Sequence, residues 1–162
     1  MRAGGERRAG GSVSKLSRAG TVFFALWGLL HVVGGASLLA TWWTDGAAEL
    51  VRTYGSSVAG TIPAELPAVA GAIGAFHAFN LLWIGALVAG LAMTWGWKGR
   101  AAGLWLNLIL AGAADLGLVL FLLLPGYMPW AEGAPGLVLL APAAACSLLG
   151  RAAMRAPVRG RA

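Results

Sequence analysis

The sequence predicts an all-α integral membrane protein, a four-helix bundle with its N and C termini in the cytoplasm. Of the 162 residues, 59% are hydrophobic and 11% are charged, and the apolar residues gather into four long runs. A soluble domain of this size cannot bury so much apolar surface, so lipid must cover the rest. The positions of the basic residues along the chain predict the orientation.

Four runs are long enough, or nearly so, to cross roughly 30 Å of hydrocarbon as helices. They cover residues 21–43, about 67–94, 101–125 and about 134–150. The fourth run is interrupted by glycine and proline at 133–136 and by Pro142. Such breaks are tolerated inside a bundle because neighbouring helices can satisfy the freed carbonyl groups. We therefore expect four spans.

The basic residues lie at three places along the chain. Arg2, Arg7, Arg8, Lys15 and Arg18 precede the first span, Lys98 and Arg100 follow the second, and Arg151, Arg155, Arg159 and Arg161 follow the fourth. Four spans bring these places to one side, which then carries eleven of the twelve Lys and Arg residues. By the positive-inside rule that side is cytoplasmic. The expected location is the cell inner (plasma) membrane, as a multi-pass protein.

The chain is expected to form one membrane domain, residues 20–151, between two basic cytoplasmic tails. Residues 1–19 are rich in Gly, Ala and Arg, which predicts a disordered tail, and residues 152–162 form the second tail. The outer loop covers residues 44–66, in which Asp45 is expected to cap a short helix that ends at Tyr54. Interfacial aromatic residues are expected at both membrane surfaces: Trp42, Trp43, Tyr127 and Trp130 outside, and Trp95, Trp97 and Trp105 inside.

Composition and motifs exclude several classes of protein. The single cysteine, Cys146, rules out an intrachain disulfide and a Cys-x-x-Cys redox pair. The net charge of +6 lies beside the spans, which predicts contact with the lipid bilayer and no nucleic-acid partner. The sequence also lacks a phosphate-binding glycine loop and a serine-nucleophile motif.

Five polar residues inside the predicted spans form the candidate site: His31, His77, Asn80, Asn107 and Asp115. At 1.5 Å per residue, His31 lies about 15 Å from the cytoplasmic start of the first span. His77 and Asp115 lie about 15 Å from the outer ends of the second and third spans. All three ionisable residues are therefore expected near the midplane.

The spacing of small residues predicts which helix faces point inward. Gly103, Asn107, Ala111 and Asp115 recur every four residues and so share one face. A charged Asp near the bilayer centre costs on the order of 3 kcal/mol, so Asp115 should face protein and either bond to a histidine or hold its proton. The expected interhelical cluster consists of His31, His77, Asn80 and Asp115.

Such a cluster fits several functions, of which the first is our expectation. It is an interhelical polar network in an accessory or assembly subunit, or in a ligand-binding membrane protein, with other membrane subunits or a homo-oligomer as partners. One alternative is a proton-coupled or small-solute transporter or channel, in which Asp115 titrates and His31 or His77 relays the proton.

Two further alternatives involve chemistry or a cofactor. In a lipid-modifying enzyme a His and Asp pair would transfer a proton, inside an apolar pocket shaped by Trp27, Phe76, Phe79 and Trp83. In a haem protein His31 and His77 would be the two axial ligands. A metal held by His31, His77 and Asp115 is suited by ligand type, but the sequence lacks local spacing such as His-x-x-x-His, and no metal ligand is assigned.

Overall fold

The computed structural model describes residues 13–155, which are almost entirely helical. Helices contain 86% of these residues, and none of them forms a strand. The all-α prediction is therefore confirmed. Most of the two predicted tails, residues 1–12 and 156–162, lies outside the described residues.

Four helical segments are long and apolar enough to cross a membrane, which confirms the prediction of four spans. They are α1 (Lys15–Asp45), α3 (Ala68–Leu91) continued by η2 (Ala92–Gly96), α4 (Ala101–Leu118) continued by η3 (Val119–Leu123), and α5 (Trp130–Arg155). Both continuations are single π-helical turns at the ends of their spans. The last helix runs through Pro135 and Pro142 and is longer than the predicted run of 134–150.

The first helix begins at Lys15, inside the range expected to be a tail. Ser14 caps it, because the Ser14 hydroxyl accepts a hydrogen bond from the Ser17 N–H at 3.1 Å. Such a cap satisfies a backbone donor that has no partner within the helix. The same hydroxyl donates to the Gly150 carbonyl at 3.3 Å, so the start of α1 and the end of α5 lie together at one end of the molecule.

The connection between α1 and α3 folds into two short helices, α2 (Ala47–Tyr54) and η1 (Ser56–Thr61). The short helix ends at Tyr54 as expected, but its N-cap is Gly46, because α1 extends through Asp45. Gly46 has a φ of 88°, a left-handed conformation that glycine adopts readily, and it ends α1 at Asp45. Because glycine has no side chain, α2 begins without a side-chain cap. Leu50 of α2 is fully buried and holds this connection against the start of α3.

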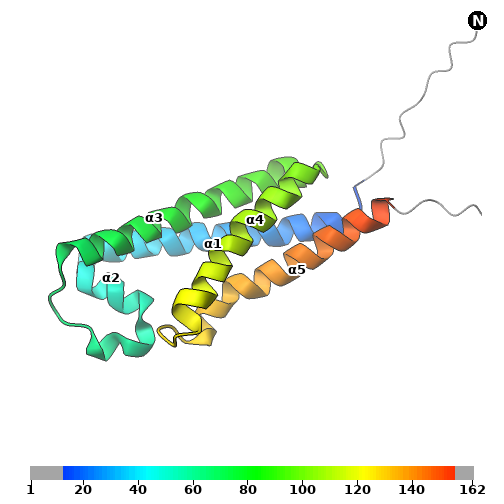
Figure 1. Cartoon of the computed structure of the whole chain (residues 1–162). Coiled ribbons are helices and arrows are strands. Elements are labelled where there is room, and N and C mark those ends of the chain that lie inside the picture. Colours follow the sequence, from blue (N-terminus) through cyan, green and yellow to red (C-terminus); the bar gives the residue numbers. More distant parts are fainter. Residues whose placement is uncertain (1–12, 156–162) are drawn as a thin grey trace, which may run out of the picture.

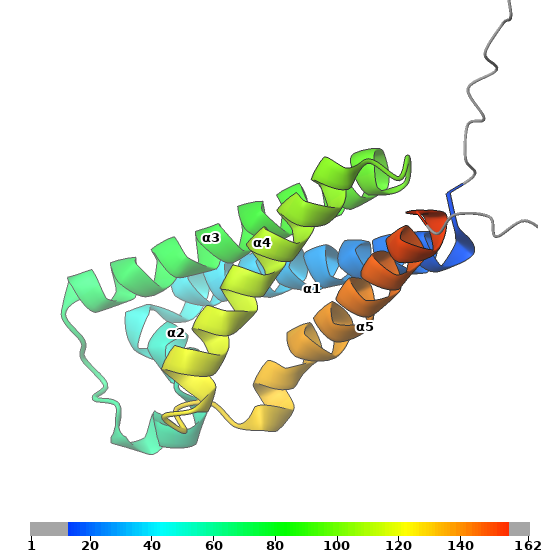
Figure 2. The same cartoon turned by 45° about the vertical axis from the view of Figure 1, so that its right-hand side comes forward.

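The first helix is the centre of the arrangement. It lies against α3 and α5, and α4 crosses obliquely in front of it (Figure 1). Both views place the start of α4 beside the end of α3 (Figures 1 and 2). They also show α4 meeting α5 at the turn that joins them and diverging from it toward the opposite end. The buried apolar core consists of Phe24, Trp27, Val88, Ala92, Leu104, Ala111 and Ala143.

The α1 and α3 backbones touch where Gly28 faces Gly85. A Cβ added at Gly28 would lie 2.5 Å from the Gly85 carbonyl oxygen, and one added at Gly85 would lie 2.6 Å from the Gly28 carbonyl oxygen. Membrane helices use such small residues to approach each other closely. This contact sets the rotation of α1 about its axis, and therefore the face on which His31 lies three residues later.

Candidate functional site

Asp115 lies on the inward face of α4. It is 2% exposed, and the residues at four-residue intervals before it, Gly103, Asn107 and Ala111, are buried as well. Because these positions share one helix face, the carboxyl group points at the neighbouring helices and away from lipid. This is the orientation that an ionisable group inside a membrane requires.

Trp27 of α1 holds the carboxyl group of Asp115. Its indole Nε1–H lies 3.2 Å from Oδ1 and 3.1 Å from Oδ2 and donates to both oxygens. The indole is completely buried, so this bond forms away from water. It joins α1 to α4 through residues that are 88 positions apart in the sequence.

His31 lies one helical turn after Trp27 and stacks on the indole, with ring centroids 3.7 Å apart and an interplanar angle of 22°. Its Nδ1 lies 2.8 Å from the Trp27 carbonyl oxygen. Because a carbonyl can only accept, Nδ1 carries the hydrogen of the neutral ring and Nε2 is unprotonated. Nε2 faces Asp115 Oδ1 at 3.9 Å, an ion-pair distance that is longer than a hydrogen bond.

The last helix closes the site with Gly136. A Cβ added there would lie 3.0 Å from Asp115 Oδ1, 3.3 Å from His31 Cε1 and 3.5 Å from Trp27 Nε1. The missing side chain therefore lets α5 cover the polar groups directly. We call Trp27, His31, Asp115 and Gly136 the midspan site.

The structure places the other predicted site residues elsewhere. His77 lies on an exposed face of α3, where its ring meets the Tyr54 ring edge-on at 5.4 Å between centroids. Asn80 accepts a hydrogen bond from Trp83 Nε1 at 2.8 Å, one turn along the same helix. Asn107 is buried and lines a separate pocket. Of the five residues, only His31 and Asp115 come together.

Two residues of the midspan site were not identified as polar-site residues from the sequence. Trp27 was expected only as an apolar wall, although its position four residues before His31 places both on one face. Gly136 belongs to a glycine and proline run that indicated only a break in the fourth span. No local pattern connects α5 to Asp115, because that contact exists only after the helices pack.

The contacts do not favour a cofactor or metal shared by both histidines. Among residues 13–155, no three His, Cys, Asp or Glu side chains are grouped so that they could hold a metal ion. The His31 ring is occupied by Trp27 and faces Asp115, whereas His77 contacts Tyr54. The expected apolar pocket is not formed either, because Phe76, Phe79 and Trp83 are exposed on α3 while Trp27 is buried.

Together, these features define a protein with four helices able to cross a membrane, in which a buried carboxyl group and a half-buried imidazole lie together where three of these helices meet. Comparison with protein-family models, with curated proteins and with solved structures finds no match to this chain. The chemistry of the midspan site is therefore the basis for the proposal that follows.

Proposed function

We propose that this chain is a four-helix-bundle protein of the inner membrane, with both termini in the cytoplasm, whose midspan site holds one proton at a helix interface. It serves as an accessory or assembly subunit, or as a ligand-binding membrane protein. The observation that carries this proposal is the pairing of Asp115, 2% exposed, with a histidine as its sole ion-pair partner among the described residues.

One proton suffices to neutralise this pair. An uncompensated charge buried inside a membrane span is unfavourable, so the site favours a neutral acid beside a neutral imidazole, or a carboxylate beside an imidazolium. Both arrangements contain the same single proton, on Asp115 or on His31 Nε2. Its loss would leave a net negative charge between α1, α4 and α5, which couples the protonation state to the packing of these helices.

Outward-facing glycines support a role beside other membrane subunits or further copies of the chain. A Cβ added at Gly34, Gly90, Gly112 or Gly117 would have no atom within 4 Å among the described residues. Small residues on a membrane helix allow another helix to approach closely. We place the partner helices on these faces.

The proton itself is the quantity to measure. In lipid nanodiscs, infrared difference spectroscopy reports a protonated carboxyl group, and nitrogen NMR reports whether a histidine ring is an imidazolium. We expect one proton on the pair at neutral pH, with Asp115→Asn and His31→Gln assigning the two signals. Asp45→Asn, which removes an exposed carboxylate at the end of α1, is the control and should change neither signal. An entirely unprotonated pair at neutral pH would contradict the proposal.

The orientation is tested by labelling with a membrane-impermeant maleimide. Cys146→Ala provides the background, into which Ser57→Cys or Lys98→Cys is introduced; both positions are exposed, at opposite ends of the spans. We expect Ser57→Cys to react on the outer surface of spheroplasts, and Lys98→Cys to react only after lysis. The reverse pattern would place the termini outside.

A second candidate function, proton-coupled transport, is favoured by the unequal exposure of the pair. The His31 side chain is 13% exposed and that of Asp115 is 2% exposed, and His31 Nε2 faces Asp115 Oδ1 at 3.9 Å. A proton can therefore pass to Asp115 through His31. In liposomes, Asp115→Asn and His31→Gln should abolish a proton flux that His77→Gln retains; equal flux in all variants would exclude this function.

A further inference from the structure

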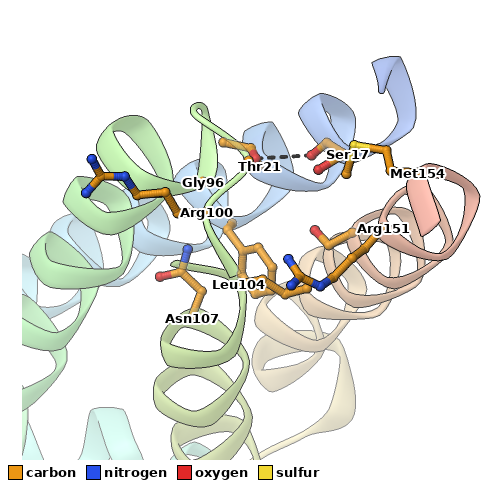
Figure 3. A pocket seen from close by; sticks show the side chains of 11 residues that line it. Ser17, Thr21, Gly96, Arg100, Leu104, Asn107, Arg151 and Met154 are labelled. Carbon is orange, nitrogen blue, oxygen red and sulfur yellow. Dashed lines mark hydrogen bonds between the residues drawn. The ribbon is translucent and has the colours of Figure 1, made fainter. Parts of the chain in front are cut away.

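A second polar site lies at the end of the molecule where α1 begins and α5 ends. A pocket there is lined by residues of α1, α4 and α5 and by the connection from η2 to α4 (Figure 3). Its polar lining consists of Ser17, Thr21, Arg100, Asn107, Ser147 and Arg151, with no acidic residue. We call it the basal pocket.

Two polar groups of the basal pocket have no partner among residues 13–155. Asn107 is 1% exposed, yet its side-chain oxygen Oδ1 accepts no hydrogen bond. The Nε of Arg151 is also buried and donates none. Buried polar groups are almost always hydrogen-bonded, so two unpaired groups in one pocket point to a ligand that accepts from Arg151 and donates to Asn107.

The charges around the pocket favour an anion. Arg100 and Arg151 line it, and no acidic residue does. The start of α1 and the end of α5 both line it, so the helix dipoles oppose one another there and the guanidinium group of Arg151 supplies the positive potential. Within residues 13–155, the acidic residues outside the midspan site, Asp45, Glu49, Glu65 and Glu132, lie at the opposite end of the spans.

The pocket also has an apolar side. Phe24, Leu104 and Met154 line it, and α4 and α5 diverge toward this end (Figures 1 and 2). Figure 3 shows Arg151 extending from α5 toward α4, whereas Arg100 points away and its guanidinium lies 6.0 Å from the centre of the Trp95 ring. Exposed Trp95, Trp97 and Trp105 at this end are typical of headgroup depth.

We propose that the basal pocket binds the headgroup of an anionic phospholipid. The phosphate accepts a hydrogen bond from Arg151 Nε, and a headgroup hydroxyl donates to Asn107 Oδ1. A glycerol headgroup supplies that hydroxyl, so phosphatidylglycerol is the preferred lipid, with its acyl chains on the apolar side of the pocket. This inference does not involve the midspan site, so either proposal can fail without the other.

The test counts lipids bound to the purified protein by native mass spectrometry during titration with phosphatidylglycerol or phosphatidylcholine. We expect one tightly bound phosphatidylglycerol per chain, and about tenfold or greater weakening in Arg151→Gln and Asn107→Leu, because each loses a hydrogen bond to the ligand. The matched control is Arg18→Gln, which removes the same charge from an exposed position outside the pocket. It should bind the lipid like the wild type.

Three outcomes would overturn the assignment. Equal weakening in Arg18→Gln would mean that diffuse surface charge attracts the lipid. Competition by glycerol phosphate or inorganic phosphate as effective as that by the lipid would mean that the ligand is a soluble anion. Equal retention of phosphatidylcholine would mean that the pocket does not distinguish one headgroup from the other. If Asn107→Leu does not fold, Arg151→Gln and Arg18→Gln, matched by melting temperature, complete the comparison.

Discussion

Replacement of Trp27 by phenylalanine tests the midspan site most directly. The substitution removes the indole N–H that donates to both oxygens of Asp115 and leaves an aromatic ring beside His31. The carboxyl group would then have no hydrogen-bond donor among the described side chains. We expect the replacement of this indole by a phenyl ring to lower the free energy of unfolding.

The magnitude follows from the contacts of Trp27. A single N–H shared between two oxygens counts as one bond, which contributes about 0.5–1.5 kcal/mol to a neutral acid and about 1.5–3 kcal/mol to a carboxylate. Trp27 is completely buried, and the smaller ring leaves a void that costs about 1 kcal/mol more. The free energy of unfolding should therefore fall by about 1.5–4 kcal/mol.

The assay is equilibrium unfolding in detergent micelles, with Trp83→Phe as the matched control. Trp83 also donates its Nε1–H to a side-chain oxygen, that of Asn80, but it is 41% exposed and bonds within its own helix. We expect this control to stay within about 0.5 kcal/mol of the wild type. A double-mutant cycle of Trp27→Phe with Asp115→Leu isolates the pairwise energy, which should exceed about 0.5 kcal/mol. Equal effects of the two Trp→Phe changes, or a coupling near zero, would refute the reasoning.

Three further predictions concern helix packing and the connection between α1 and α3. Gly85→Ala should force α1 and α3 apart, lower the free energy of unfolding by about 1–3 kcal/mol and so lower the melting temperature, while Gly60→Ala, with open space around it, should not; equal shifts would argue against the close crossing. Gly136→Ala should displace the Asp115 carboxyl group and change its infrared signal, and an unchanged signal would place α5 farther from the site. Burial raises the pKa of Tyr54 above its ordinary value of 10.0, so the unfolded chain loses this proton first and the unfolding free energy falls as pH rises above that value. Tyr54→Phe should remove that part of the pH dependence, and a titration curve identical to the wild type would contradict it.

The sequence alone determined that the chain is all-helical and that four of its segments are long and apolar enough to cross a membrane. Hydrophobicity and length are properties of each segment by itself. Comparing that length with the thickness of the hydrocarbon core shows which segments can span a membrane. The constant rise of the helix then converts position into depth, which is why His31 and Asp115 were expected at one level.

Only the tertiary structure decided which polar groups meet. Depth does not specify the rotation of a helix about its axis, and that rotation depends on contacts such as the backbone crossing of Gly28 and Gly85. The crossing accompanies an α3 orientation in which His77 lies outside the midspan site, against Tyr54. The packing of α5 likewise brings Gly136 over Asp115. Partners across helices depend on the joint rotation of several helices, and no single segment contains that information.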